Sequence, residues 1–179
     1  MIADQPAVLD TCVVINLLAT NRIAEIVQVI APNVMVCSAV SSESLYLRSM
    51  DADGKPESVD LTSLFTAGVL THCGIETEAE EELYVSYALE LDDGEAMSLA
   101  IAHARNLTLA TDERKARQVI RENIPEVRLV STAEIIHEWA QTREPAEVAT
   151  VLRSIQVRAR FWPQDPDPLA PWWGALIEL

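Results

Sequence analysis

The sequence predicts an α/β fold, a three-layer α/β/α sandwich around a central, mainly parallel sheet. Short apolar runs alternate with helical segments along the chain, as in sheets whose strands are covered by helices on both faces. Apolar residues make up 49% of the 179 residues, which predicts a substantial core and excludes a disordered chain. No internal repeat is visible, so a solenoid is not expected.

The predicted strands are short, apolar and bounded by residues that cap helices or form turns. In chain order they cover residues 6–10, 34–37, 69–73, 107–110 and 127–130. The predicted helices between them cover residues 13–19, 22–30, 39–50, 60–68, 78–91, 95–104, 114–122 and 132–141. Ser38 is the expected N-cap of the 39–50 helix, and the polar segment 51–58 is expected to be a loop.

Two regions are predicted, a main α/β domain over 1–143 and an extension over 144–179. The extension begins with a helix to about residue 160. Residues 161–179 contain four prolines and three of the four tryptophans. Proline opposes regular structure, but this many indole rings would not stay free in water. The extension either packs on its own domain as an extended arm or docks a second copy or a partner.

Charge and composition bound the function. The net charge of −15 and the pI of about 4.4 argue against broad electrostatic attraction to nucleic acid. They do not exclude a nucleic-acid enzyme, because bound cations offset carboxylates gathered in a metal site. The three cysteines lack zinc-ligand spacing and are expected to be buried free thiols. With no signal peptide and no bilayer-spanning run, we expect a cytoplasmic protein without a membrane partner.

Two acids stand where functional sites form in parallel sheets. Asp10 follows the first strand and Asp112 follows the 107–110 strand. The carboxyl ends of parallel strands meet at one sheet edge, where ligands bind. Each acid also precedes a helix, so each has a capping interpretation.

Two further acids lie on apparently apolar helix faces. Glu43 shares its predicted face with 39, 40, 46 and 47, and no basic residue is nearby on that face. Glu95 opens the apolar 95–104 helix, although an acid in a first turn also complements the helix dipole. Four convergent carboxylates would repel one another unless cations neutralised them. Oxygen ligands suit Mg²⁺ or Mn²⁺, which promote hydrolysis of phosphodiesters.

A basic segment follows Asp112 directly. Arg114, Lys115 and Arg117 would lie at the rim of the acidic site, where they could bind RNA phosphates. The alternative is a solvated helix face whose charges pair with Glu113 and Glu122. Aromatic residues total 5%, so a dedicated platform for stacking single strands is not expected.

Four segments resemble the PIN-domain family of metal-dependent ribonucleases: VLDTCVVINLL (8–18), SSESLYL (41–47), DDGEAMSLAIAHA (92–104) and LTLATDERKAR (107–117). The resemblance spans roughly residues 6–136. It implies a Mg²⁺ or Mn²⁺ site on Asp10, Glu43, Glu95 and Asp112, with Glu113 as an auxiliary acid. It also implies that Thr11 or Thr111 hydrogen-bonds a ligand carboxylate or a water molecule.

The leading hypothesis is therefore an endoribonuclease that cleaves RNA to 5′-phosphate and 3′-hydroxyl ends. The family includes the toxins of toxin–antitoxin pairs, which are often dimers, so an antitoxin protein and a homodimer are candidate partners. A second hypothesis is a non-catalytic scaffold that binds a protein or self-assembles. A third is a haloacid-dehalogenase-like phosphatase, but that family needs a second Asp where this chain has Cys12.

Overall fold

A five-stranded parallel sheet organises the chain. The computed structural model describes residues 2–43, 45–50 and 55–178. The sheet order is β5-β2-β1-β6-β7, and all four pairings are parallel. Its strands are β1 (Ala7–Leu9), β2 (Val34–Cys37), β5 (Thr71–Cys73), β6 (Thr108–Ala110) and β7 (Leu129–Val130). The predicted parallel sheet and α/β class are confirmed.

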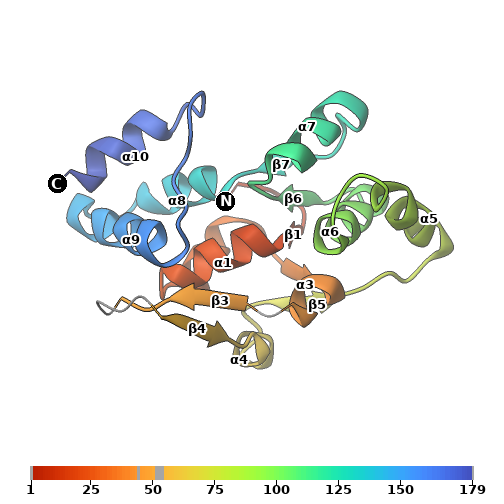
Figure 1. The fold of residues 1–179 in the computed structure, drawn as a ribbon, viewed down its shortest axis with the longest axis horizontal. Coiled ribbons are helices and arrows are strands. Elements are labelled where there is room, and N and C mark those ends of the chain that lie inside the picture. Colours follow the sequence, from red (N-terminus) through yellow and green to blue (C-terminus); the bar gives the residue numbers. More distant parts are fainter. Residues whose placement is uncertain (1, 44, 51–54, 179) are drawn as a thin grey trace.

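Helices cover both faces of this sheet (Figure 1). Helix α6 (Asp93–Ala104) packs on strands β1, β2 and β6, and α5 (Glu78–Tyr87) packs on α6. Helices α1 (Thr11–Ala19) and α8 (Thr132–Ala140) pack together on the other side. The remaining described helices are α2 (Ile23–Ile26), the 3₁₀ turn η1 (Val27–Val29), α3 (Ser38–Ser42), α4 (Thr62–Thr66), α7 (Arg114–Asn123), α9 (Pro145–Arg158) and α10 (Ala170–Ile177).

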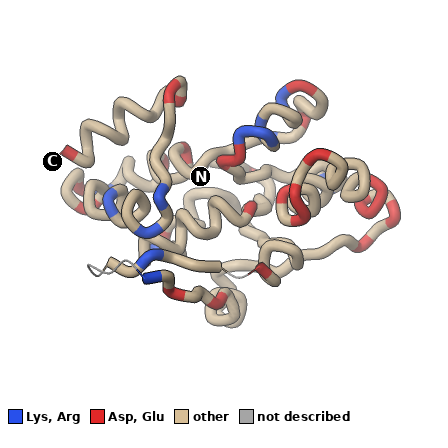
Figure 2. The backbone as a smooth tube through the Cα atoms, viewed as in Figure 1, with Lys and Arg blue, Asp and Glu red and all other residues tan. Residues whose placement is uncertain are grey.

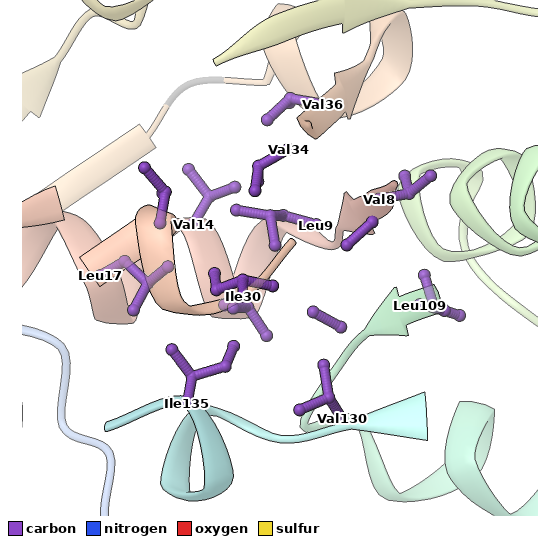
Figure 3. Close-up of a cluster of buried hydrophobic side chains, with 14 of the residues drawn as sticks. Val8, Leu9, Val14, Leu17, Ile30, Val34, Val36, Leu109, Val130 and Ile135 are labelled. Carbon is purple, nitrogen blue, oxygen red and sulfur yellow. The ribbon is translucent and has the colours of Figure 1, made fainter. Parts of the chain in front are cut away.

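The core lies between the sheet and these helices. Strand β1 is buried along its whole length, so its side chains alternate between two apolar layers. In Figure 3, Leu9 faces Val14, Leu17 and Ile135, which come from α1 and α8, whereas Val8 lies towards α6. Each fully buried aliphatic side chain contributes about 1.5–3 kcal/mol relative to exposure. This packing fixes the ends of β1 and β6, where Asp10 and Asp112 follow.

The prediction of a helix over 39–50 is wrong beyond Ser42. Helix α3 ends there, and β3 (Leu45–Arg48) pairs antiparallel with β4 (Pro56–Val59). Burial alternates along β3, with Leu47 buried and Tyr46 53% exposed, so these two do not share a face. The alternating Leu-Tyr-Leu pattern fits a half-buried strand better than a helix.

Two neighbouring predictions change with it. The residue at the N-cap of α3 is Cys37, and the Ser38 hydroxyl instead donates a hydrogen bond to Met97 Sδ. The expected loop 51–58 is wrong for 56–58, which belong to β4, and its residues 51–54 lie outside the described residues.

The carboxyl-terminal segment packs on its own chain. Trp173 of α10 is 2% exposed, and the Phe161 ring meets it edge-on with centroids 5.7 Å apart. Helix α10 lies against α9, which contacts α1 and β3. The expectation of irregular structure throughout 161–179 is wrong for α10, because Pro171 stands in its first turn, where no hydrogen-bonded N–H is needed.

No single helix of the described ranges is long and apolar enough to cross a membrane. Residues Thr11–Ala19 and Ile23–Val29 meet the length and composition test only as a pair bent by 117°. The three cysteines are free, as expected; Cys37 and Cys73 are buried and Cys12 is partly exposed.

Candidate active site

Asp10 is a buried acid at the carboxyl end of β1. It occupies the N-cap of α1, where one oxygen accepts the Thr11 backbone N–H at 2.7 Å. The other accepts the Thr111 hydroxyl at 2.7 Å and the Cys12 thiol at 3.3 Å. Burial raises the pKa of Asp10, and these hydrogen bonds oppose the rise. The capping interpretation holds for this residue, and so does the expected contact with Thr111.

Asp112 lies at the end of the adjacent strand β6 and binds the start of α8. Its carboxylate accepts the Thr132 N–H at 2.9 Å, the Thr132 hydroxyl at 2.5 Å and Asn16 Nδ2 at 3.0 Å. Burial raises its pKa to about 6 in spite of these donors. Asp112 does not cap α7, as one interpretation had it, because Glu113 occupies that N-cap.

Cys12 connects the two strand-end acids. Its thiol donates to Asp10 and its sulfur accepts the Asp112 backbone N–H, both at 3.3 Å. Burial and then the charges of Asp10 and Asp112 raise the pKa of this thiol far above its ordinary value. Cys12 is therefore a neutral thiol that holds the ends of β1 and β6 together.

Glu43 reaches the same region by a different route from the one expected. It is the extended C-cap residue of α3 rather than a residue of a longer helix. Its Oε1 lies so close to the start of α6 that a Cβ on Gly94 would be only 2.6 Å away. Burial is the main cause of its raised pKa; the Thr11 hydroxyl opposes the rise, and the charges of Asp92, Asp10 and Asp93 add to it.

Glu95 stands in the first turn of α6. It forms a capping box with Asp92, in which the Glu95 N–H donates to Asp92 at 2.9 Å and the Glu95 carboxylate accepts the Asp92 N–H at 3.3 Å. Burial raises the pKa of Glu95 to about 7, with further contributions from Asp92, Asp10 and Glu113. The helix-terminus interpretation is thus confirmed, and Glu95 also lies within the field of Asp10.

The structure brings the four acids to one region, and two local features suit a cation. The Thr11 hydroxyl is buried and makes no complete hydrogen bond in the described part of the chain, although it lies near enough to the Glu43 carboxylate to oppose the rise of its pKa. It lies against Gly94, which leaves space for the Glu43 carboxylate beside it. Among the described residues, however, no three acidic, histidine or cysteine side chains are close enough to hold an ion together. What fits a hard divalent cation is therefore the chemistry of the carboxylate oxygens, not a ready-made set of three converging ligands.

The basic residues after Asp112 have different environments. Arg117 donates to the Thr111 carbonyl at 2.8 Å, and its charge lowers the pKa of Asp112. Lys115 donates to the Glu90 carbonyl. Arg114 has no hydrogen bond or ion pair among the described residues. The alternative interpretation, in which these charges pair with Glu113 and Glu122, is not seen in the described part of the chain.

Sequence reasoning missed the residues that hold the acids in place. Asn16 and Thr132 together supply the three hydrogen bonds that orient Asp112. A signal was present for Asn16, because an amide inside the apolar run Val13–Leu18 must find a buried partner. No local signal marked Thr132, which is 20 residues from Asp112 in the chain.

Comparison with known proteins identifies the family of the chain. A family model described as a PIN domain matches residues 6–166, which is most of the chain and includes α9 and the segment after it. No curated protein and no solved structure matches the chain. PIN domains have a nuclease-type fold and typically use divalent metals. The chain belongs to the PIN-domain family.

Proposed function

We propose that this PIN domain is a Mg²⁺- or Mn²⁺-dependent endoribonuclease that hydrolyses RNA phosphodiester bonds. The observation that carries the proposal is the convergence of Asp10, Glu43, Glu95 and Asp112, from four separate segments, with all four pKa values raised. Perturbed acids that gather at the carboxyl edge of a parallel sheet are typical of functional sites.

In this proposal the acids divide the work. Asp10, Glu95 and Asp112 hold the principal cation, and Glu43 completes the site as a ligand or by orienting water. Glu113, exposed at the start of α7, is an auxiliary acid. A divalent cation bound there supplies two effects: it makes water easier to deprotonate and it neutralises negative charge on the phosphate.

Neighbouring residues fix the orientation of the acidic side chains through hydrogen bonds. Asn16 and Thr132 orient Asp112, and Thr111 orients Asp10. The Thr11 hydroxyl, which has no other partner in the described residues, is placed to hydrogen-bond water or the Glu43 carboxylate. The basic residues at the rim of the site bind the phosphates of the RNA: Arg114, Lys115 and Arg117. Arg114 can do so without breaking a protein contact, because it has no hydrogen bond or ion pair in the described ranges.

Asp112→Asn tests the proposal directly, with cleavage of a labelled RNA in the presence of Mn²⁺ as the readout. Asp60→Asn is the matched control, because Asp60 is exposed and holds only its own turn through Thr62. We expect at least a hundredfold slower cleavage for Asp112→Asn and wild-type cleavage for Asp60→Asn. Wild-type cleavage by a folded Asp112→Asn protein would refute the assignment.

A non-catalytic scaffold is the second candidate. It is favoured by one observation, that no three potential ligands among the described residues are close enough to share an ion. A scaffold would bind neither Mn²⁺ nor Mg²⁺ through these carboxylates. Calorimetric titration with Mn²⁺ separates the two, because only the nuclease requires a cation affinity that Asp112→Asn lowers.

The toxin role extends the nuclease proposal. If the chain is the toxin of a toxin–antitoxin pair, its expression arrests bacterial growth, and expression of Asp112→Asn does not. Co-expression of an antitoxin encoded next to the gene would restore growth and co-purify with the chain. Growth arrest by the inactive variant would separate toxicity from RNA cleavage.

A further inference from the structure

A cleft of about 1510 Å³ opens beside the acid site. Cys12, Asn16 and Asp112 are among its lining residues. One wall is α7, and the other is the segment 159–169 between α9 and α10, here called the arm. In Figure 1 the arm and α7 project on either side of the amino-terminal end of the chain, above the sheet. A molecule that fills this cleft therefore lies next to Asp112.

Five arginines line the cleft, together with seven acidic side chains. Its lining arginines are Arg114, Arg117, Arg121, Arg128 and Arg160. Figure 2 shows basic residues at the start of α7, whereas acids gather along α5 and the start of α6. The chain has 28 acidic and 13 basic residues, so ion-pair partners are abundant. Even so, Arg114, Arg121 and Arg160 have no hydrogen bond or ion pair in the described part of the chain.

Acidic side chains also line the cleft, but several are already engaged. Glu134 accepts hydrogen bonds from the Ser131 N–H and hydroxyl. Glu122 accepts from Gln118, and Asp167 accepts from the Leu169 N–H. These hydrogen bonds hold the three carboxylates in local turns and helix ends without neutralising their charge, whereas Arg114, Arg121 and Arg160 have no partner in the described residues and are available to an anion.

An indole ring completes the arm side of the cleft. Trp162 lines the cleft and is 47% exposed. The arm around it is anchored, because Phe161 packs edge-on against the buried Trp173 and Pro163 is itself buried. An exposed indole on an anchored segment loses little conformational freedom when a flat ring stacks on it. Unpaired guanidinium groups and one available indole match the two parts of a nucleotide, its phosphate and its base.

We propose that a single strand of RNA occupies this cleft on its way to the acid site. Arg114, Arg121 and Arg160 bind its phosphates, and Trp162 stacks on one base. The occupant is a single strand, because bases inside a duplex are stacked on one another and cannot reach an indole. This inference rests on the proposed ribonuclease function and adds the route by which substrate reaches it.

Fluorescence anisotropy with a labelled RNA of about 12 nucleotides tests the proposal. The chain is held in EDTA, so that binding is measured without cleavage. Trp162→Ala is expected to weaken binding about 5- to 100-fold and to leave the salt dependence unchanged, because stacking releases no counterions. Trp162→Phe keeps a ring and is expected to recover much of the affinity.

The arginines give a different signature. Arg121→Gln and Arg160→Gln each remove one phosphate contact, so each is expected to reduce the slope of log K against log salt by about 0.7. Arg48→Gln is the matched control, since Arg48 is exposed on β3 and does not line the cleft. It is expected to bind RNA as the wild type does. Thermal melting establishes that every variant is folded.

Several results would overturn the proposal. These are wild-type affinity in the folded Trp162 and arginine variants, equal binding of duplex and single strand, or arginine-dependent binding of polyglutamate but not of RNA. The last result would assign the cleft to an acidic protein partner. RNA binding in the cleft without Mn²⁺-dependent cleavage would refute the ribonuclease function but support the assignment of the cleft as an RNA-binding site. Mn²⁺-dependent RNA cleavage that the cleft variants leave unaffected would support the ribonuclease function but refute the cleft as the route of the substrate.

Discussion

Adding one methyl group at Gly94 is expected to disturb the geometry of the acid site while leaving the stability of the fold nearly unchanged. It is in the first turn of α6, and a Cβ there would be 2.6 Å from Glu43 Oε1 and 3.3 Å from Thr11 Oγ1. Non-bonded heavy atoms prefer about 3.5 Å or more, so Gly94→Ala must move the Glu43 carboxylate by about 1 Å. The moving atom is the end of a flexible side chain, so the fold need not change.

The expected effects on stability and on cation binding therefore differ. Alanine in place of a helical glycine stabilises by about 0.5–1 kcal/mol, which offsets the cost of the displaced carboxylate, and the melting temperature should change little. A change that shifts or reorients a ligand typically costs about 10- to 100-fold in metal affinity. We expect Gly94→Ala to weaken Mn²⁺ binding and slow RNA cleavage by factors in this range.

Gly174→Ala provides the matched control. Gly174 is also helical, and a Cβ there would meet no atom within 4 Å. It should raise the free energy of unfolding by about 0.5–1 kcal/mol and leave Mn²⁺ affinity unchanged. Calorimetric titration and thermal melting of both variants make the comparison. Mn²⁺ affinity in Gly94→Ala equal to that of the wild type would refute the placement of Glu43 in the site.

Three further predictions concern pH and packing. The pKa of Glu95, about 7 against its ordinary 4.5, means that the metal-free fold favours the protonated acid. This contribution to stability is present below pH 4.5 and is lost as pH rises through 7, so the melting temperature without metal should fall across this window. Mn²⁺ affinity should rise between about pH 5 and 8, because the ion binds the deprotonated acid. A melting temperature and a Mn²⁺ affinity that do not change with pH would contradict this prediction. Arg105→Met leaves the buried Glu80 carboxylate without its ion-pair partner, which now holds the Glu80 pKa at about 2. The free energy of unfolding in urea should fall by about 3 kcal/mol, and an unchanged midpoint would show that the pair is dispensable. Trp173→Ala should cost about 3–5 kcal/mol and Trp173→Phe much less, because the indole N–H has no partner in the described residues; equal losses would point to the N–H instead of the packing.

The strand-end acids could be predicted because their positions depend on local pattern and simple topology. Short apolar runs mark β1 and β6, and parallel strands place Asp10 and Asp112 at the same edge. The detailed role of Asp112 could not be predicted. Its partners Asn16 and Thr132 come from α1 and α8, and only the tertiary packing brings them together.

Glu43 was singled out through a helix that ends one residue before it. The positions 43, 46 and 47 satisfy a helical period, but Leu45, Tyr46 and Leu47 also satisfy the period of a strand, and the pairing with β4 decides between them. Helical spacing alone could not make that choice. Likewise, the cleft is lined by both α7 and the arm, which is far from α7 in the chain, so composition gave no indication that Trp162 and Arg121 would line the same cleft.

Mn²⁺ binding to the wild type and to Asp112→Asn, measured by calorimetry and followed by RNA cleavage on the same samples, tests the central claim most directly. If the four acids form a catalytic metal site, the wild type binds Mn²⁺ and cleaves RNA, and Asp112→Asn loses both while it remains folded. Absence of Mn²⁺ binding in the wild type would contradict the metal-dependent nuclease and favour the non-catalytic scaffold.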